Sequence, residues 1–336
     1  MTARIGLLGR MDDGGLGTMT WEFARHIHPE RVLIVDLGHE GRGKGHIERY
    51  TDNCNEVGVS TSWPGFDAEA ANWLLRDIDI LYTAETFYWP EIQAMCTQRG
   101  IRTVLHSMPE LHAPGLAADQ IWVPTTWEQE RIPGARYIPV PVALDRFESR
   151  QSERAEAFLH IVAPAMLDRN GTDALLGALP LINEPCEIRF RGLDLELTNP
   201  SSPAAPRNLG GKENYWEMTE DGDVLLMPRR YGGLSLPMQE AMARGMPIIT
   251  TDLLPQKEWG GVLAVPVTSP RPVQMKGGVF HVWDVAHNSL AAAIENLVRN
   301  PGTFRKLSEE ARRHAGSISW DRMGPIYRAE FEDLLA

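Results

Sequence analysis

Short apolar runs alternate with longer amphipathic segments along most of this 336-residue chain, and this alternation limits its fold more than any other feature. Runs such as residues 3–9 (ARIGLLG) and 31–38 (RVLIVDLG) are typical of strands that are buried on both faces of a parallel sheet. The segments between strands, such as residues 18–28 and 66–77, place apolar side chains at helical spacing. A strand–helix–strand repeat of this kind predicts an α/β protein with doubly wound parallel sheets.

The pattern is interrupted once and then begins again, which predicts two domains. The prolines of YIPVPVALDRF (137–147), with Gly134 just before them, exclude a regular element there. We therefore expect an N-terminal domain over residues 1–145 and a C-terminal domain over residues 146–318, two Rossmann-like folds that face each other across a cleft. Further strands are expected at residues 77–84, 101–107, 120–125, 158–165, 186–192, 223–228, 246–252 and 261–267, and a surface loop at residues 200–208.

Charge and cysteine content narrow the class of protein. The 45 acidic and 33 basic residues give a net charge of −12, which argues against the whole surface binding nucleic acid. Cys54, Cys96 and Cys186 have no CxxC spacing, so neither a disulfide framework nor a thiolate zinc site is expected. Because no apolar run is long enough for a signal-peptide core or a membrane span, we expect a cytoplasmic protein. We also expect no bound metal, because the sequence lacks a cluster of metal-ligating residues.

The segment YGGLSLPMQEAMARGMPIITTD (231–252) predicts a ligand site in the second domain. Gly232 and Gly233 let the backbone approach a bound group, and a helix beginning near Leu236 offers unpaired N–H groups to a diphosphate. Glu240, in about the second turn of that helix, is placed to bind the hydroxyls of a ribose. The alternative is a plain loop–helix–strand connection in which Glu240 is a solvated helix residue.

A second glycine loop, RMDDGGLGT (10–18), follows the first strand and opens a helix. The amides around Gly15 and Gly17 are candidates to bind a phosphate or a sugar, although the loop does not fit the GxGxxG fingerprint. Asp12 and Asp13 either bind an acceptor hydroxyl or cap the helix. Three further polar side chains lie at strand ends, where ligands bind in open α/β sheets: Glu85, His106 and Glu110.

Residues 231–252 resemble the donor-site motif of retaining GT-B glycosyltransferases, in particular family four, which commonly runs Tyr-Glu-Gly-Phe-Gly-Leu-Pro-x-x-Glu-Ala-Met-Ala-x-Gly-x-Pro. With Glu240 on the second glutamate, the matching positions are Tyr231, Gly233, Leu236, Pro237, Ala241, Met242, Ala243, Gly245 and Pro247. Other pieces resemble the family in the family's order, namely GGLG (14–17), LHSMPE (105–110), VPVALDRF (140–147), NGTDALLGAL (170–179) and SISWDRMGPIYRAEFEDLL (317–335).

The resemblance implies a GT-B fold in which the last helix, residues 319–335, crosses back onto the first domain. It implies a nucleoside-diphosphate sugar as donor, bound by the second domain, and an acceptor that enters over the first domain near Asp13, Glu85 and Glu110. His106 would contact the donor sugar as a polar group rather than as a titrating base. The reaction would retain the anomeric configuration, and the departing phosphate would help to deprotonate the acceptor hydroxyl.

Three family positions carry other residues in this chain. The first glutamate of the motif, which contacts donor-sugar hydroxyls in the family, falls on Gly232. The usual arginine and lysine of an earlier loop fall on Ala165 and Asn170. The residues available to neutralise a leaving diphosphate instead, unless they are solvated loop residues, are Arg169, which adjoins the usual lysine position, Arg229 and Arg230.

These observations favour a glycosyltransferase that moves a sugar from a nucleoside diphosphate to a small-molecule or glycan hydroxyl and needs no cofactor. Three alternatives stay open. One is a non-catalytic sugar-nucleotide or glycan-binding protein, suggested by the missing glutamate, and another is a sugar-nucleotide epimerase. The third is a glycosyltransferase that acts on hydroxymethylated bases in DNA, because the loop HEGRGKGHIER (39–49) carries Arg42, Lys44, His46 and Arg49 on the expected acceptor side.

Overall fold

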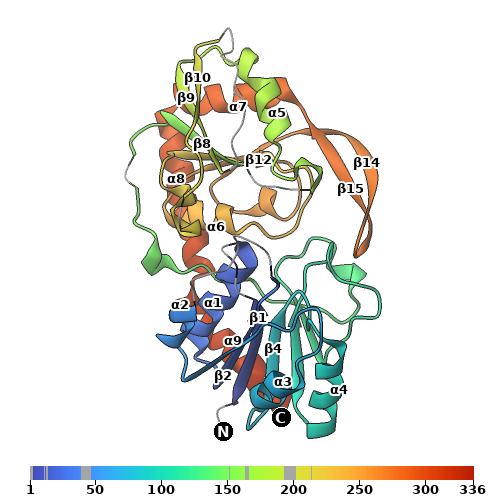
Figure 1. Ribbon diagram of the computed structural model, residues 1–336. Helices are drawn as coiled ribbons and strands as arrows, with labels where there is room; N and C mark the ends of the chain where they lie inside the picture. The colour runs from blue at the N-terminus through green and yellow to red at the C-terminus, as the bar shows by residue number, and fades with distance from the viewer. Residues whose placement is uncertain are drawn as a thin grey trace. The chain divides into compact units, whose positions relative to one another are not determined.

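The computed structural model describes residues 3–10, 12, 14–38, 47–150, 152–162, 166–192, 202–212 and 214–336. The chain forms two compact units: unit 1 is Met1–Pro141 with Trp320–Ala336, and unit 2 is Val142–Ser319 (Figure 1). Each unit has its own parallel sheet and its own apolar core. No helix in the described part of the chain is long and apolar enough to cross a membrane.

Unit 1 contains a seven-stranded parallel sheet in the order β3-β2-β1-β4-β5-β6-β7. Its strands are β1 (Ile5–Arg10), β2 (Arg31–Val35), β3 (Glu56–Ser60), β4 (Ile80–Ala84), β5 (Arg102–His106), β6 (Gln120–Val123) and β7 (Arg136–Tyr137). The order reverses between β1 and β4, and such a switch point is where doubly wound sheets bind ligands, at the carboxyl ends of the strands.

Helices cover both faces of the unit 1 sheet. The helices are α1 (Gly15–Ile27), α2 (Ile47–Thr51), α3 (Ala68–Leu74), α4 (Pro90–Arg99) and α9 (Trp320–Leu335). On one face, Phe23 of α1 stacks on Tyr82 at 4.0 Å between ring centroids, and Phe331 of α9 lies edge-on to Tyr82 at 6.1 Å. On the other face, Leu74 of α3 and Ile92 of α4 pack in a second apolar cluster. Burying each such side chain contributes about 1.5–3 kcal/mol to folding.

Unit 2 repeats the same winding with a six-stranded parallel sheet in the order β10-β9-β8-β11-β12-β13. Its strands are β8 (Ala157–Val162), β9 (Cys186–Gly192), β10 (Ala204–Asn208), β11 (Val224–Leu226), β12 (Ile248–Thr251) and β13 (Val262–Val265). Helices α5 (Thr172–Ala178) and α7 (His287–Arg299) pack on one face, and α6 (Leu236–Ala243) and α8 (Pro301–Ser317) pack on the other. The switch point of this sheet lies between β8 and β11.

Short 3-10 helices lie in the connections of both units. They are η1 (Gln129–Arg131), η2 (Leu144–Arg146), η3 (Met166–Asp168), η4 (Leu179–Leu181), η5 (Tyr215–Thr219) and η6 (Gln256–Glu258). Of these, η3 follows β8 and contains Leu167 in the left-handed region at φ 66°, so the chain turns sharply there.

Two segments differ from the sequence-based expectation. The predicted surface loop at residues 200–208 was wrong for Ala204–Asn208, which form the edge strand β10, where Pro206 is tolerated because one side of an edge strand needs no partner. Residues after β13 form a two-stranded antiparallel hairpin, β14 (Val267–Met275) and β15 (Gly278–Val285), which pairs with neither parallel sheet and projects from unit 2 in Figure 1.

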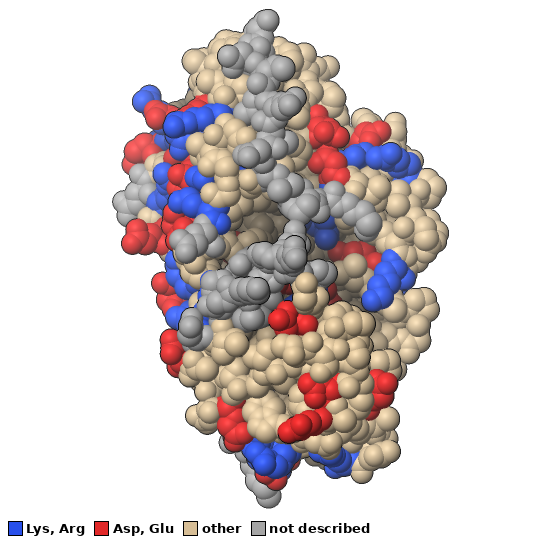
Figure 2. Space-filling model, viewed as in Figure 1, with Lys and Arg blue, Asp and Glu red and all other residues tan. Residues whose placement is uncertain are grey.

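Basic and acidic side chains are interspersed on the surface. In the view of Figure 2 they alternate along the left border of unit 2, and no continuous basic patch is seen on the described part of that face. Between β9 and β10, Glu187 pairs with Arg207 at 3.3 Å.

Candidate functional site

Two loops meet at the switch point of the unit 2 sheet. The chain that follows β8 carries Arg169, and the chain that follows β11 carries residues 229–233. The amide of Arg230 donates to the carbonyl oxygen of Arg169 at 3.0 Å, so the two loops are joined directly. Because ligands of doubly wound sheets bind at this position, the two loops form the candidate site of unit 2.

Gly171 allows the close approach of these loops. It adopts the left-handed backbone conformation at φ 77°, and a Cβ placed on it would lie 2.1 Å from the carbonyl oxygen of Pro228. Any other residue would therefore push the loop after β8 away from the loop after β11. Gly171 is also the N-cap of α5, so its left-handed conformation is needed both for the approach of the two loops and for the start of the helix.

Two arginine side chains converge on one backbone carbonyl in the site. Arg169 donates through Nη2 to the carbonyl oxygen of Gly232 at 2.9 Å, and Arg229 donates to the same oxygen at 3.0 Å. Arg169 also lies over the ring of Tyr231, with its guanidinium carbon 4.6 Å from the ring centroid. Arg229 is 3% exposed. Two guanidinium groups thus meet at the backbone of Gly232, the position of the first glutamate in the motif that this segment resembles.

Helix α6 begins directly after this pair of arginines. Gly233 adopts φ 92° and its carbonyl oxygen accepts a hydrogen bond from Gln256, which fixes the turn before the helix. Leu236 is the first helical residue, Pro237 has no N–H, and the amide of Met238 donates to the carbonyl oxygen of Ser235 at 3.2 Å. The start of α6 therefore offers a ligand mainly the positive end of the helix dipole. Glu240 lies in the next turn and is only 4% exposed, so it is not the solvated residue of the alternative interpretation. Its contact with a ribose stays a prediction.

The guanidinium group of Arg230 binds the hairpin β14–β15. Its Nη2 pairs with Asp284 at 2.7 Å, its Nε donates to the carbonyl oxygen of Trp283 at 3.0 Å, and its Nη1 donates to that of Leu167 at 3.2 Å. The amide of Trp283 in turn donates to the carbonyl oxygen of Arg230 at 2.8 Å. The predicted role of Arg230 in neutralising a diphosphate would require breaking the ion pair with Asp284. In this structure the side chain fastens β15 to the site loop.

Residues that the sequence did not single out complete this region. Asp168 caps α5 by accepting hydrogen bonds from the amides of Thr172 at 2.8 Å and Asp173 at 3.0 Å. Burial raises the pKa of Asp168, while those amides oppose the shift. Asn170, at the usual lysine position, turns inward and donates to the carbonyl oxygen of Ile161 at 3.0 Å. Asp168 lies three residues before the N-cap Gly171, so the usual N-cap pattern does not identify it from the sequence.

In unit 1, His106 ends β5 but points into the core rather than to a ligand surface. It is 0% exposed, and its Nδ1 lies 3.1 Å from the hydroxyl of Tyr82. The ring centroid lies 5.8 Å from that of Trp122 and 6.3 Å from that of Tyr327. Burial lowers the pKa of His106 to about 3, so the imidazole is neutral at pH 7. The predicted contact with a donor sugar therefore needs a rearrangement of this packing.

The glycine loop of unit 1 is closed by Asp12. Its Oδ1 accepts from the amides of Gly14 at 2.8 Å and Gly17 at 3.2 Å, and its Oδ2 pairs with Arg10 at 2.5 Å. Asp12 thus acts as the helix cap that was one of its two predicted roles. A phosphate at the amide of Gly17 would have to displace it. Gly15 begins α1, whereas the predicted acceptor ligand Asp13 lies outside the described residues.

Two further carboxylates were predicted on the acceptor side of unit 1. Glu85 follows β4 at the switch point, adopts φ 63°, and donates its amide to the carbonyl oxygen of His106 at 2.9 Å. A non-glycine residue in that region is strained, and strain of this kind is common at functional sites. Glu110 is 3% exposed. The structure therefore brings Glu85 to the ligand edge of the sheet and buries Glu110.

Two predictions are not covered by the contacts above: the roles of residues outside the described ranges, and the absence of a bound metal. Ala165 and residues 39–46 of the basic loop are outside the described residues, and of that loop Arg49 lies over the ring of Trp21 at 5.8 Å. Across the described ranges no group of three or more His, Cys, Asp and Glu side chains is arranged to hold a metal. Independence from metals and cofactors stays a prediction.

Solved structures share this architecture over almost the whole chain. A sucrose-phosphate synthase from Thermosynechococcus elongatus is similar with a TM-score of 0.70 and 14% identity, covering 98% of this chain and 100% of that chain. Anabaena Alr3699/HepE in complex with UDP has a TM-score of 0.69 and 11% identity, with coverage of 98% and 100%. The lipopolysaccharide outer core galactosyltransferase WaaB has a TM-score of 0.63 and 10% identity, with coverage of 99% of each chain. Neither a protein-family model nor a curated protein matches the chain.

The class of fold follows from these findings. Two parallel sheets with the same winding, together with similar glycosyltransferase structures that match from end to end, define a two-domain Rossmann-like GT-B fold. The fold class predicted from the alternating pattern and the motif resemblance is thereby confirmed.

Proposed function

We propose that this protein is a retaining glycosyltransferase, similar to family four, that transfers a sugar from a nucleoside diphosphate to a hydroxyl of a small molecule or glycan. The observation that carries the proposal is the convergence of Arg169 and Arg229 on the carbonyl of Gly232, immediately before the first turn of α6. Positive charge beside the start of a helix favours a diphosphate. HepE, which shares the fold, has structures with UDP and with UDP-glucose.

In the proposed complex the donor lies against unit 2. Its diphosphate meets Arg169 and the first turn of α6, and its ribose hydroxyls meet the carboxylate of Glu240 in the following turn. The bond between the anomeric carbon and the diphosphate oxygen breaks, and the acceptor oxygen bonds to the same face of the sugar. The acceptor proton passes to an oxygen of the departing diphosphate. The protein supplies position and positive charge where negative charge develops.

Isothermal titration with UDP tests the donor site. We expect Glu240→Gln to weaken UDP binding by about 10- to 100-fold, because a charge-assisted hydrogen bond contributes about 1.5–3 kcal/mol. Glu309→Gln, on the exposed side of α8 in the same unit, is the matched control and should bind UDP like the wild type. Equal affinity of the wild type and Glu240→Gln for UDP would overturn the ribose assignment.

A second candidate function is sugar-nucleotide binding without transfer. It is favoured by Gly232, because the carboxylate of the family motif is replaced by a carbonyl held by two arginines. The two functions differ in whether UDP is released from UDP-glucose in the presence of acceptor sugars, measured with and without EDTA. UDP release that survives EDTA supports transfer without a metal. Tight UDP binding with no release from any donor and acceptor pair supports the binding protein.

A further inference from the structure

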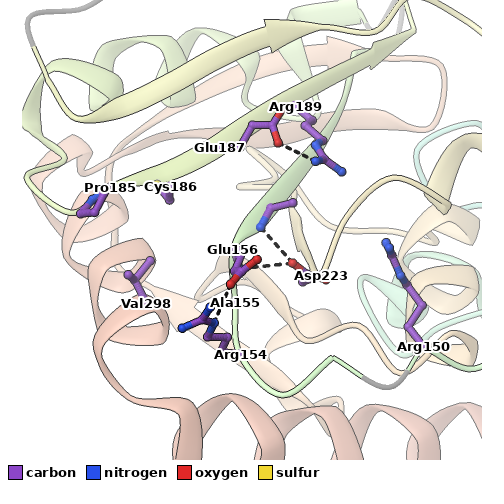
Figure 3. A pocket seen from close by; sticks show the side chains of 11 residues that line it. Arg150, Arg154, Ala155, Glu156, Pro185, Cys186, Glu187, Arg189, Asp223 and Val298 are labelled. Carbon is purple, nitrogen blue, oxygen red and sulfur yellow. Dashed lines mark hydrogen bonds and ion pairs between the residues drawn. The ribbon is translucent and has the colours of Figure 1, made fainter.

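The charged side chains of a cavity at the amino ends of the unit 2 strands, about 650 Å³ in volume, are paired with one another. In Figure 3 the carboxylates of Glu156 and Asp223 lie between Arg154 and Arg189. Arg154 pairs with Glu156 at 2.5 Å, and Arg189 pairs with Glu187 at the same distance. Asp223 accepts a hydrogen bond from the amide of Glu156 at 3.2 Å. These contacts join the beginnings of the strands and balance the charges of the cavity without a ligand.

The carboxyl edge of the unit 1 sheet, in contrast, carries an exposed tryptophan. Trp63 lies in the loop that follows β3 and is 37% exposed. Its ring centroid is 6.0 Å from that of Tyr88, which follows β4, and the two rings are inclined at 86°. Because β2 and β1 lie between β3 and β4 in the sheet, the two loops meet across the carboxyl ends of the central strands. An aromatic surface is therefore found where doubly wound sheets bind ligands.

The loop that carries Trp63 is held in place by Asp67. One carboxylate oxygen of Asp67 accepts from the hydroxyls of Ser60 at 2.6 Å and Ser62 at 3.3 Å, and the other accepts from the amide of Ala70 at 3.0 Å. The hydrogen bonds from Ser60 and Ala70 lower the pKa of Asp67, so the cap of α3 is ionised at neutral pH. A ligand that packs on Trp63 therefore meets a loop that is already ordered, which reduces the entropic cost of binding.

The loop that carries Tyr88 is ordered and strained. Glu85 adopts φ 63° and Tyr88 adopts φ 61°, so two non-glycine residues within four positions occupy the left-handed region. The hydroxyl of Thr83 donates to the carbonyl oxygen of Thr86 at 2.7 Å, and the amide of Tyr88 donates to the hydroxyl of Thr86 at 3.3 Å. Strain of this kind persists only where the surroundings enforce it, and it is concentrated at ligand sites.

Charged groups surround the phenol of Tyr88. Burial raises the pKa of Tyr88, the positive charge of Arg10 lowers it, and the negative charges of Glu85 and Asp12 raise it further. Arg10 ends β1 and pairs with Asp12 at 2.5 Å, whereas Glu85 is half-buried at the end of β4. Tyr88 therefore connects the aromatic ring of Trp63 with a carboxylate at the switch point of the sheet.

We propose that the acceptor is a carbohydrate, bound at this edge of unit 1 with the apolar face of a pyranose ring on Trp63 and a hydroxyl on the carboxylate of Glu85. A pyranose matches both features of the edge, because it has a face of C–H groups that packs on an aromatic ring and a rim of hydroxyls that donate to a carboxylate. Only the description of this sugar as the acceptor rests on the proposed function, and its binding does not.

Saturation-transfer NMR and isothermal titration of the full chain, each with and without saturating UDP, test the site. The probes are the methyl glycosides of glucose, galactose and mannose, together with sorbitol, which has hydroxyls but no ring face, and phenol, which has a ring face but a single hydroxyl. We expect at least one methyl glycoside to bind in the millimolar range, with its ring C–H protons most strongly saturated. Sorbitol and phenol should bind more weakly.

Variants identify the residues responsible. Trp63→Ala should weaken binding of that glycoside by about tenfold, because the ring face is removed, whereas Trp63→Phe should retain most of it. Glu85→Gln should weaken it about fivefold, because a neutral amide is a weaker partner than a carboxylate. The matched control is Tyr137→Ala, since Tyr137 is a 47% exposed aromatic residue on β7, at the opposite edge of the same sheet, and should bind like the wild type.

Absence of glycoside binding with and without UDP, or equal binding by Trp63→Ala and the wild type, overturns the site. Phenol bound as tightly as the best glycoside overturns the carbohydrate class, and unchanged binding by Glu85→Gln removes that carboxylate from the site. A chain that binds glycosides through Trp63 and no UDP would count against the proposed function and leave the sugar site standing. Acceptor-dependent UDP release that Trp63→Ala leaves unchanged would do the reverse.

Discussion

At the scale of single residues, the burial of His106 has a consequence that can be measured as a function of pH. Its folded-state pKa of about 3 lies below the ordinary value of 6.5, so the unfolded chain binds the proton more readily. The contribution of neutral His106 to the free energy of unfolding is therefore complete above pH 6.5 and is lost as the pH falls toward 3. Between pH 6.5 and pH 5 the loss amounts to about 2 kcal/mol. When the free energy of unfolding is measured with urea at pH 6.5 and at pH 5, it should therefore fall by about 2 kcal/mol less for His106→Gln than for the wild type.

The control for this experiment is His281→Gln, because His281 is exposed on β15. Identical pH dependence of the wild type and His106→Gln would contradict the buried, neutral assignment.

The sequence placed His106 correctly at a strand end, but its burial depends on Tyr327, more than two hundred positions further along the chain. Likewise the sequence distinguished Arg169, which adjoins the usual lysine position, from Arg230, but it gave no sign that Arg230 pairs with the distant Asp284. Contacts between such remote residues leave no local pattern.

At the scale of elements, the hairpin β14–β15 is joined to the site loop by Arg230, and a double-mutant cycle can show what this contact does. If Arg230 acts by holding the hairpin, Asp284→Ala should lower the kcat for sugar transfer, Arg230→Ala should lower it at least as much because it also loses the bonds to Trp283 and Leu167, and the double variant should be no worse than Arg230→Ala. If Arg230 itself binds the diphosphate, Arg230→Ala should lower kcat, whereas Asp284→Ala, which keeps the guanidinium group, should not. Asp284→Ala should change stability little, because Asp284 is 54% exposed and such pairs contribute about 0–1 kcal/mol. Arg230→Ala should cost more, because it also removes hydrogen bonds to the carbonyl oxygens of Trp283 and Leu167.

The matched control for this cycle is the pair Lys257 and Asp252, an exposed ion pair of unit 2 at 3.3 Å, whose removal should leave kcat unchanged.

The strands of the hairpin β14–β15 were not predicted from the sequence. Pro270 and Pro272 in β14 oppose a strand assignment. In β15 the buried Phe280 and Val282 have Val279 and Trp283 as neighbours, so the sequence shows no clear alternation of apolar and polar residues. The strands of the parallel sheets were predictable because burial on both faces requires continuous apolar runs.

At the scale of the whole molecule, the division into two doubly wound parallel sheets could be predicted from the sequence. Two series of buried strands joined by segments that carry helices admit few topologies, because parallel crossovers are almost always right-handed, and both units wind in the same order. Glycine loops at strand ends then indicated where ligands approach, and in unit 2 the loops after β8 and β11 do meet. The acceptor has no such local signature, because its class depends on the charge and shape of a whole surface.

The acceptor is the subject of the last prediction. With a net charge of −12 and basic side chains interspersed with acidic ones on the described face in Figure 2, we expect no binding to DNA at physiological salt. A gel-shift titration on duplex DNA containing hydroxymethylcytosine measures this. DNA binding through phosphates falls by about 0.9 log units per contact for each log unit of salt. Binding at low salt that follows this law, and that disappears when Arg42, Lys44 and Arg49 are all replaced by alanine, would contradict a small-molecule or glycan acceptor and make modified DNA the substrate. Binding that the triple replacement leaves unchanged would instead be independent of the basic loop, and no shift at any salt would exclude DNA.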